Sequence, residues 1–430
     1  MGLKMSRKLP LVVILGPTGS GKTKLSLEVA TKFGGEIIGA DSMQVYRGLN
    51  IASAKATEEE QAVAPHHLIN ILEPDQLFTV LEYRNRAVPI IEDLLKSDKL
   101  PVVVGGTNYY IESLLWRILV QNPEEKVLTQ TGMLPSNQHE LASSVLHEQL
   151  KRLDPAMARR LHPNNKRKIL RSLEILHQRG KKHSEIIDEQ CQTSMSTSGG
   201  GLRYDNAVVF WLQCDQDVLN KRLDDRVDKM IEEGLLEELL HFHKVYNQQR
   251  LLEGGPPDYT KGIFQSIGFK EFHSYLILSE AEKTSEVGRK LLQLAIDELK
   301  MVTRRYARKQ IKWMSNRFLS RKDRQVPPIY ALDTSDVAQW TQKVTNPAFR
   351  IVESHICGTL STIEPLPMRD TVSVPNLLDD SYLCEVCNRI FVGKHQRDIH
   401  MNSRKHRKIL ANKAKQQKLS LASNEEACGR

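Results

Sequence analysis

The chain has 430 residues and a formal net charge of +9, which is long enough for two to four domains and a sizeable core. Its longest purely aliphatic run, Leu11–Leu15, is far too short to span a bilayer. Six thinly spread cysteines suit a reducing compartment and argue against a disulfide scaffold. The first ten residues contain three Lys or Arg and no acid, as in a mitochondrial presequence remnant or a ragged terminus.

An α/β fold class is predicted from the pattern of apolar runs. Between residues 9 and 110, short apolar runs alternate with amphipathic stretches, and a further apolar run follows at 207–214. Continuous apolar strands separated by helices predict a parallel sheet covered on both faces. Residues 116–204 are helical, polar and basic in pattern, so we predict a helical insertion between two parts of the core, 1–115 and 205–325.

Three further segments are predicted toward the carboxyl end. Residues 326–379 contain prolines and are weakly patterned, which indicates a linker or a strap. A small separate module is expected at 380–410, and a basic tail at 411–430 is predicted to be disordered. Between Arg389 and Lys418, ten Lys or Arg residues accompany one acid. This local excess of positive charge favours a polyanionic partner.

A phosphate-binding loop follows the first predicted strand. The stretch GPTGSGKT fits G-x-x-x-x-G-K-[ST] between an apolar strand and a helix, which predicts a P-loop NTPase-like core. Its glycines let backbone N–H groups turn toward a phosphate, the lysine adds a charge, and the threonine hydroxyl can hold Mg²⁺. The candidate phosphate-binding residues are Gly16, Pro17, Thr18, Gly19, Ser20, Gly21, Lys22 and Thr23.

An acid, Asp41, follows the second predicted strand. Kinases and NTPases usually present a second acid after an apolar strand to position magnesium, but the strand at 100–104 ends in two glycines and Thr107. Asp41 lies within reach of the phosphate loop if the first two strands are neighbours. It could then accept a proton from a nucleophile that attacks the phosphorylated group. The alternative is an N-cap for a following helix, and the residues alone leave both roles open.

Seven sequence blocks, in this order, carry a resemblance to a known family. They are GPTGSGKT, ADSMQVYRGLNI, PHHLIN, VVVGGTNYYIESLL, LHPNNKRKILRSLEI, RLDDRVDKMIEEGLLEE and IFQSIGFKEF. Together they resemble the tRNA dimethylallyltransferases (tRNA isopentenyltransferases) over residues 10–318. The additional module at the carboxyl end resembles that of eukaryotic members, including those that serve mitochondria.

The resemblance implies a reaction and a set of roles. Members of this family transfer the dimethylallyl group from dimethylallyl diphosphate to N6 of the adenosine 3′-adjacent to the anticodon of tRNA. The phosphate loop would then bind a diphosphate leaving group. The implied catalytic residues are Asp41 as proton acceptor, Thr18 and Lys22 at the diphosphate, Arg226 on the departing diphosphate, and Thr107 beside the catalytic channel. Thr23 would face the metal.

An exocyclic adenine amine is a poor nucleophile, so this chemistry needs a positioned base and strong stabilisation of the developing negative charge. The base must also leave its stack to reach a buried carboxylate, which means base flipping. Ser42, Met43 and Gln44 are expected to contact the flipped nucleotide beside Asp41.

Basic and loop residues are expected to hold the anticodon stem-loop. Lys300, Arg304, Arg308 and Lys312 recur every four residues and predict a basic stripe on one helical face, although a solvated face has the same pattern. Such phosphate contacts position an RNA without reading it. The family uses the QSIGFKEF block against the anticodon region, while Phe269 is equally compatible with a core position. The candidate tRNA-binding residues are Asp41, Ser42, Met43, Gln44, Lys166, Arg167, Lys168, Arg171, Gln265, Ser266, Gly268, Phe269, Lys270, Arg304 and Arg308.

A second metal site is predicted in the small module at 380–410. Cys384, Cys387, His400 and His406 have the two-cysteine, two-histidine spacing of a tetrahedral Zn²⁺ site. Phe391 and Ile399 are expected to supply its core. The five-residue gap between the histidines resembles matrin-like fingers that bind structured RNA, and the basic flank is expected to bind phosphates non-specifically. A purely structural module is the alternative.

Two competing functions have support in the residues. A small-molecule or nucleotide kinase with an RNA-binding appendage would use Arg222 and Arg226, which are spaced four apart as lid arginines can be. A non-catalytic RNA-binding protein would carry an inactive phosphate loop. For the transferase, the expected partners are tRNA and dimethylallyl diphosphate without a membrane, the expected state is a monomer, and the expected locations are mitochondria and cytoplasm, with the nucleus as a further one.

Overall fold

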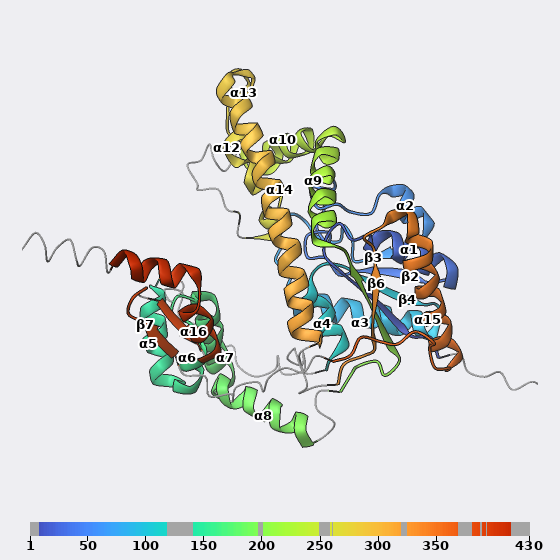
Figure 1. Cartoon of the computed structure of the whole chain (residues 1–430), viewed down its shortest axis with the longest axis horizontal. Coiled ribbons are helices and arrows are strands. Elements are labelled where there is room, and N and C mark those ends of the chain that lie inside the picture. The colour runs from blue at the N-terminus through green and yellow to red at the C-terminus, as the bar shows by residue number, and fades with distance from the viewer. Residues whose placement is uncertain are drawn as a thin grey trace, which may run out of the picture. The chain divides into compact units, whose positions relative to one another are not determined.

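The computed structural model describes residues 8–117, 141–196, 201–248, 259, 261–319, 325–368, 381–387, 389–392 and 394–413. The chain divides into two compact units, of which the first is Met1–Gln121 with Gly200–Asp370 and the second is Asn122–Gly199 with Thr371–Arg430. Figure 1 shows the elements of each unit. Within the described part of the chain, no helix has the length and apolarity needed to cross a membrane.

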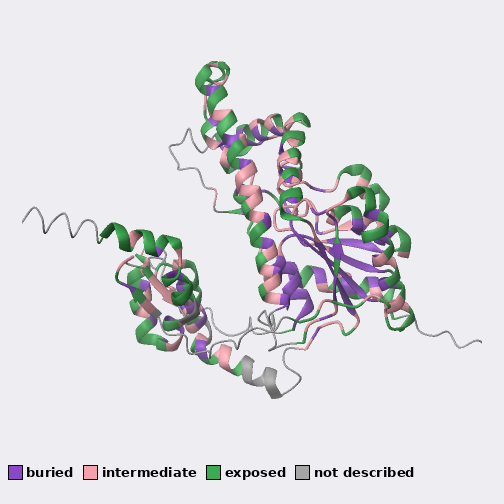
Figure 2. Cartoon of the chain, viewed as in Figure 1, coloured by how far each residue is buried: buried purple, intermediate pink, exposed green. Residues whose placement is uncertain are grey.

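A six-stranded sheet lies at the centre of the first unit. Its strands, in spatial order, are β3 (His66–His67), β2 (Glu36–Gly39), β4 (Pro101–Val104), β1 (Leu11–Leu15), β5 (Ala207–Gln213) and β6 (Ile329–Asp333), and all neighbours are parallel. Every residue of β1 is buried, as expected for a strand with helices on both faces, and the sheet is mostly purple in Figure 2. The predicted parallel α/β core is confirmed.

Hydrophobic clusters cover both faces of this sheet. One face packs on α3 (Val80–Lys96) and α4 (Asn108–Leu115). The other packs on α1 (Lys22–Phe33) and α15 (Asn346–Cys357). Helix α1 begins directly after Gly21, whose φ of 87° lies in the left-handed region that residues with a Cβ rarely adopt. The phosphate loop therefore enters its helix through a glycine that the turn requires.

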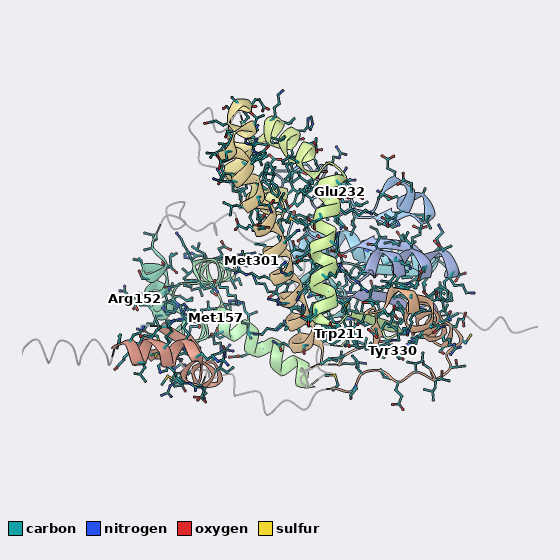
Figure 3. All side chains as sticks on the ribbon, turned by 45° about the horizontal axis from the view of Figure 1, so that its top comes forward. Arg152, Met157, Trp211, Glu232, Met301 and Tyr330 are labelled. Carbon is teal, nitrogen blue, oxygen red and sulfur yellow. The ribbon has the colours of Figure 1, made fainter. Side chains whose placement is uncertain are left out.

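Residues 326–368 belong to the core, so the prediction of a linker at 326–379 is wrong for this stretch. Strand β6 pairs with β5 along its whole length, and the buried Trp211 and Tyr330 of these strands belong to clusters on opposite faces (Figure 3). This strand carries only a weak pattern in the sequence because it has five residues and alternates buried and exposed positions at its end. The remainder of the predicted linker, 369–379, lies outside the described residues.

Long helices adjoin the carboxyl end of the sheet. The longest of them is α14 (Glu286–Met314), which continues into the π-helix η5 (Ser315–Leu319). Helix α14 packs along α9 (Gln216–Glu232), and Figure 3 labels Met301 and Glu232 on this pair. The other elements of this unit are α2 (Glu58–Val63), α10 (Leu235–Tyr246), α12 (His273–Leu276), α13 (Glu280–Thr284), the 3₁₀ helices η3 (Gly262–Gln265), η4 (Lys270–Phe272) and η6 (Val337–Gln339), and the π-helix η7 (Thr341–Thr345).

The second unit contains the predicted insertion and the small module. The described part of the insertion is helical, as predicted, with α5 (Ser143–Leu153), α6 (Pro155–Arg160), α7 (Lys166–Arg179) and α8 (His183–Ser196). Its helices share a core that includes Leu146, Leu150 and Leu173. The small module pairs β7 (Ser381–Cys384) with β8 (Arg389–Val392) in antiparallel fashion and continues into α16 (Lys394–Met401). Residues 404–413 are helical, so the prediction of a disordered tail is wrong for 411–413, and the rest of that tail, 414–430, lies outside the described residues.

Candidate active site

A cavity of about 310 Å³ opens where β1 and β2 end. Its walls come from the phosphate loop, the segment after β2, the helices α9 and α14, and the residues 265–267. In open parallel sheets, ligands bind at the carboxyl ends of the strands. The predicted site residues among its lining are Thr18, Asp41, Ser42, Met43, Arg226, Gln265 and Ser266. Residues far apart in the sequence are thus brought to one hollow, as the resemblance implied.

The phosphate loop is wrapped around its own lysine. The Lys22 Nζ atom donates hydrogen bonds to the carbonyl oxygens of Gly16, at 3.0 Å, and Pro17, at 2.9 Å. Burial lowers the pKa of the Lys22 amine to about 8, although the nearby charge of Asp41 opposes this shift. The amine is therefore held against the loop and remains largely charged at neutral pH, which suits an anionic ligand.

Asp41 reaches this site although its strand does not adjoin that of the phosphate loop. Strand β4 lies between β1 and β2, so the condition that these strands be neighbours does not hold. The intervening strand ends in glycines, which leave room. A methyl group on Gly105 would lie 2.1 Å from the Ala40 carbonyl oxygen, and one on Gly106 would lie 3.5 Å from Asp41 Oδ2. The side-chain-free end of β4 lets Asp41 face the cavity.

The environment of Asp41 suits a proton acceptor rather than a helix cap. Its Oδ1 atom accepts a hydrogen bond from the Met43 N–H at 2.9 Å, but residues 42–45 form a turn and the next helix begins at Glu58. The N-cap alternative is therefore wrong. Burial raises the pKa of the Asp41 carboxyl, and the Met43 N–H and the charges of Lys22 and Arg226 oppose this shift. A raised pKa makes the carboxylate a better base.

Arg226 and Arg222 point to different partners, although they are one turn apart on α9. Arg226 Nη1 donates a hydrogen bond to Thr18 Oγ1 at 3.2 Å, so its guanidinium lies over the phosphate loop. Arg222 donates to the carbonyl oxygens of Thr334, at 2.6 Å, and Ser335, at 2.8 Å. The pair of lid arginines that a kinase would use is therefore not formed, because Arg222 holds main chain after β6.

Thr107 supports the loop that carries Asp41. Its Oγ1 atom accepts a hydrogen bond from the Ser42 N–H at 2.9 Å, and lies 3.1 Å from Ser42 Oγ. Its own N–H donates to the Ala40 carbonyl oxygen at 3.0 Å. Thr107 is not among the residues that line the described cavity. The structure thus gives it a positioning role next to the acid.

The residues expected to contact the flipped nucleotide divide into two groups. Ser42 and Met43 line the cavity. Gln44 instead donates from Nε2 to the carbonyl oxygens of Ser53, at 3.1 Å, and Ala54, at 3.0 Å. Its amide therefore braces the wall of the cavity, and a contact of Gln44 with tRNA stays a prediction.

The predicted tRNA-binding residues in the block at 265–272 also differ in whether they line the cavity. Gln265 is exposed, and both Gln265 and the buried Ser266 line the cavity, while Lys270 is exposed on the outside. Phe269 is fully buried, with its ring 5.3 Å from that of Phe242. The core alternative is therefore the correct one for Phe269, and its assignment to tRNA binding is wrong. Gly268 is buried beside it and has a φ of 107°.

The predicted basic stripe on α14 is partly neutralised by acids of α9. Lys300 pairs with Asp228 at 2.6 Å, and Arg304 pairs with Asp224. Arg308 and Lys312 are exposed, and among the described residues neither has an ion-pair partner. Arg305 and Lys309, which the four-residue spacing missed, are also exposed. The cations available to a polyanion are thus a group at the end of α14, and the assignment of Arg304 to tRNA binding is weakened.

The basic residues of the insertion lie on α7. Arg167, Lys168 and Arg171 are exposed and Lys166 is half-buried. Arg171 pairs with Glu174 at 3.1 Å, at an exposed position where such a pair contributes little stability. These side chains can reach a phosphate backbone, and their contact with tRNA stays a prediction.

Two α14 residues at the site have no signal in the sequence. Gln310, which is 4% exposed, accepts a hydrogen bond from the Thr18 N–H at 2.9 Å and donates one to the Gly106 carbonyl oxygen at 3.1 Å. Tyr306 lines the cavity and donates to the same carbonyl at 3.4 Å. Burial and the charge of Asp41 raise the pKa of its hydroxyl. Gln310 joins the phosphate loop to the end of β4, and only its neighbours in space reveal that role.

The four predicted zinc ligands come together in the small module. His406 Nδ1 lies 3.6 Å from Cys384 Sγ, 3.4 Å from Cys387 Sγ and 3.2 Å from His400 Nε2. A zinc tetrahedron with bonds of about 2.0–2.3 Å has edges of about 3.3–3.8 Å. The four ligand atoms lie within 4.8 Å of one another, so the residues fit Zn²⁺.

Of the two residues predicted to form the core of this module, only one packs on a zinc ligand. The Phe391 ring stacks on His400, with centroids 4.3 Å apart, whereas Ile399 is 53% exposed. Adjacent helical positions point in different directions, and His400, the neighbour of Ile399, takes the inward place as a zinc ligand. The prediction for Ile399 is wrong.

Comparisons with known proteins agree with the sequence blocks and with the site. The family model described as IPP transferase matches residues 44–317, that of isopentenyl transferase matches residues 9–72, and that of a C2H2-type zinc finger matches residues 382–406. A tRNA dimethylallyltransferase from Homo sapiens is 46% identical over 405 residues, covering 94% of this chain and 86% of the relative. One from Saccharomyces cerevisiae is 32% identical over 434 residues, covering 96% and 94%.

A solved structure shares the fold. It is that of a eukaryotic dimethylallyltransferase acting on tRNA, which matches with a TM-score of 0.78 and 29% identity and covers 96% of this chain and 100% of that one. Since a family model matches more than half of the residues and the relatives align over most of the length, the chain belongs to the IPP transferase family, that of the tRNA dimethylallyltransferases.

Proposed function

We propose that this protein is a tRNA dimethylallyltransferase, which transfers the dimethylallyl group of dimethylallyl diphosphate to N6 of the adenosine 3′-adjacent to the anticodon. The products are N6-isopentenyladenosine in tRNA and diphosphate. One observation carries the proposal: Asp41 faces the same cavity as Thr18 of the phosphate loop and Arg226. A base and a diphosphate site in one hollow are what an alkylation with a diphosphate leaving group requires.

Different residues of the site serve the proton transfer and the departure of the diphosphate. A bond forms between N6 of adenine and the first carbon of the prenyl group, while the bond from that carbon to the diphosphate oxygen breaks. The electron pair leaves with the diphosphate, and the N6 proton passes to Asp41. Lys22, Arg226 and the N–H groups at the start of α1 stabilise the developing negative charge. The raised pKa of Asp41 favours its acceptance of the proton.

The adenine must leave its stack to enter this cavity. Asp41 is half-buried, and the cavity around it includes apolar side chains such as Leu223, Met230 and Leu299. A base within a stacked loop would not reach that carboxylate, so the nucleotide is flipped. The apolar lining also keeps water from competing with the amine for the prenyl group.

The residues at the phosphate loop fit Mg²⁺ bound together with a diphosphate. Thr23, which is exposed at the start of α1, offers a neutral hydroxyl. Mg²⁺ keeps several waters and often takes only one or two protein ligands beside phosphate oxygens. Thr23 would hold the ion, which would supply charge neutralisation to the diphosphate.

The competing kinase is tested by the same experiment as the transferase. The protein is incubated with tRNA and either labelled dimethylallyl diphosphate or ATP labelled in its terminal phosphate. We expect label in RNA from the prenyl donor alone, and N6-isopentenyladenosine in digests of that RNA by mass spectrometry. Label transferred from ATP to a small molecule would overturn the assignment in favour of a kinase. An RNA-binding protein without activity would give no label in either case.

We also propose that the protein is a monomer. We propose that it acts in mitochondria and cytoplasm, with the nucleus as a further location. The proposed locations are supported by the basic composition of the first ten residues and by the resemblance to eukaryotic members. Fluorescent tagging at the carboxyl end, with microscopy, tests the locations, and a single nuclear signal would contradict them. Sedimentation of the purified protein tests the monomer.

A further inference from the structure

An aromatic ring from the carboxyl end of the first unit lies against the phosphate loop. A methyl group on Gly21 would come within 2.6 Å of Trp340 Cη2 and 2.7 Å of Cζ3. Gly21 immediately precedes α1, and Trp340 is 6% exposed. The indole therefore packs on the main chain where the diphosphate-binding N–H groups of α1 begin.

Two kinds of interaction hold this ring on α1, and a further hydrogen bond holds its partner Glu28. Trp340 Nε1 donates to both carboxylate oxygens of Glu28, at 3.0 and 3.1 Å. The Thr345 hydroxyl donates to Glu28 Oε2 at 2.7 Å. The Lys24 ammonium lies 4.7 Å from the centroid of the indole ring. A cation at this distance from an aromatic face is attracted to it, so the ring is held at its Nε1 edge by Glu28 and over its face by Lys24.

The same segment, residues 334–345, also contacts the helix that presents Arg226. Arg222, one turn earlier on α9, donates to the carbonyl oxygens of Thr334 and Ser335. Thr334 is fully buried. This segment therefore touches both parts of the diphosphate site: the start of α1 through Trp340, and α9 through Arg222.

We propose that Trp340 is a positioning residue of the transfer reaction, which sets the place of the α1 amino terminus and so the affinity of the enzyme for the diphosphate of its prenyl donor. This inference rests on the proposed function. Backbone N–H groups bind a phosphate only when they converge on it, and they cannot be moved one at a time. A ring pressed on Gly21 and anchored to Glu28 prevents the loop and the helix from shifting against each other.

A matched control exists at the other end of the same helix. The Phe349 ring, from α15, packs edge-on against Phe33 at 5.6 Å and has Lys32 5.9 Å from its centroid. It repeats the arrangement of an aromatic side chain with a lysine on α1, but it lies at the carboxyl end of α1, away from the phosphate loop. Loss of either ring removes buried aromatic surface, and only loss of Trp340 frees the loop.

The test compares Trp340→Ala, Glu28→Ala and Phe349→Ala in the full chain. KM for dimethylallyl diphosphate, kcat, tRNA affinity and the affinity for inorganic diphosphate, by calorimetry with Mg²⁺, are measured well below each Tm. For Trp340→Ala we expect KM to rise and diphosphate affinity to fall by about tenfold or more, as small misplacements of positioned groups allow. Glu28→Ala should change both in the same direction. Phe349→Ala should lower Tm and leave both unchanged.

Two results would overturn the inference. One is an unchanged KM and diphosphate affinity in both Trp340→Ala and Glu28→Ala; the other is an equal change in Phe349→Ala. If Trp340→Ala does not fold, Glu28→Ala alone decides, because it keeps the ring and removes its anchor. The proposed function is contradicted by a different result, namely that the wild-type protein transfers no prenyl group. Even then, the diphosphate affinities of the variants test the role of Trp340.

Discussion

Arg226 and Thr18, which are separated by the whole helical insertion, meet at 3.2 Å through Nη1 and Oγ1. The contact places a guanidinium over the phosphate loop. Such preorganised charge stabilises a departing anion without the cost of reorganisation during the reaction. The two arginines of α9 therefore have different partners, and we expect Arg226 to serve the chemistry and Arg222 the fold.

This difference predicts opposite outcomes for the two arginines. Arg226→Ala should lower kcat/KM by about 10²–10³-fold, the usual loss of one transition-state donor, with little change in Tm. Arg222→Ala should lower Tm, because it leaves two main-chain carbonyls without their donor. Steady-state kinetics and thermal unfolding of both variants check this. Equal kinetic losses would show that the assignment is wrong.

Asp41→Asn should lower the single-turnover rate by about 10²-fold or more, since an amide cannot accept the amine proton. Binding of tRNA should persist, because the side chain keeps its size. Burial raises the pKa of this carboxyl, and only the ionised form acts as a base. The wild-type rate should therefore fall as pH decreases through a pKa above that of an ordinary aspartate. A rate that stays constant down to pH 4 would contradict this role.

Gln310→Leu should reduce both activity and stability. The substitution leaves the Thr18 N–H without its acceptor and removes one of the two donors to the Gly106 carbonyl oxygen, which also accepts from Tyr306; an unpaired buried group costs about 1–3 kcal/mol. Gln310→Glu, which keeps the acceptor for Thr18 and loses the donor for Gly106, serves as the comparison. Urea unfolding and prenyl transfer are measured on both. A leucine variant as stable as the wild type would refute the bridging role.

The cations at the end of α14 that have no ion-pair partner in the described part of the chain should bind RNA phosphates. Arg308→Ala and Lys312→Ala should each weaken tRNA binding and reduce the slope of log affinity against log salt by about 0.7–0.9. Arg304→Ala and Lys300→Ala should change this slope less, because their side chains are already paired with Asp224 and Asp228. Binding isotherms at several salt concentrations distinguish the pairs. Equal slopes for all four variants would indicate that the α9 acids release their partners to RNA.

Replacement of Cys384 and Cys387 by serine should remove zinc from the small module. We expect weaker tRNA binding, most visibly at high salt, and a largely unchanged single-turnover rate at saturating tRNA. Metal analysis together with these two measurements checks the prediction. A rate that fell as far as in Asp41→Asn would mean that the module takes part in the chemical step.

Local spacing was sufficient for the features that depend on neighbours in the chain. The phosphate loop, Gly16 to Thr23, needs consecutive backbone N–H groups at one helix start, and the zinc site needs four side chains on one hairpin and the two helical segments that follow it. The apolar strands of a two-sided sheet are similarly visible as uninterrupted runs. The ordered blocks that resemble the family identified Asp41 as the candidate base. In the structure Asp41 lines the same cavity as Thr18, and burial raises the pKa of its carboxyl.

Other features depended on contacts between distant segments, and only the tertiary structure decided them. The sheet order puts β4 between Asp41 and the phosphate loop, and its terminal glycines decide whether the acid can face the cavity. The pairing of Arg304 with Asp224 is set by the packing of α14 on α9. Gln310 and Trp340 show no local pattern, because hydrogen-bond geometry and aromatic contact are properties of pairs in space. The amino-acid sequence by itself determined which chemical groups are present, whereas the tertiary structure determined which of them lie close enough to act together.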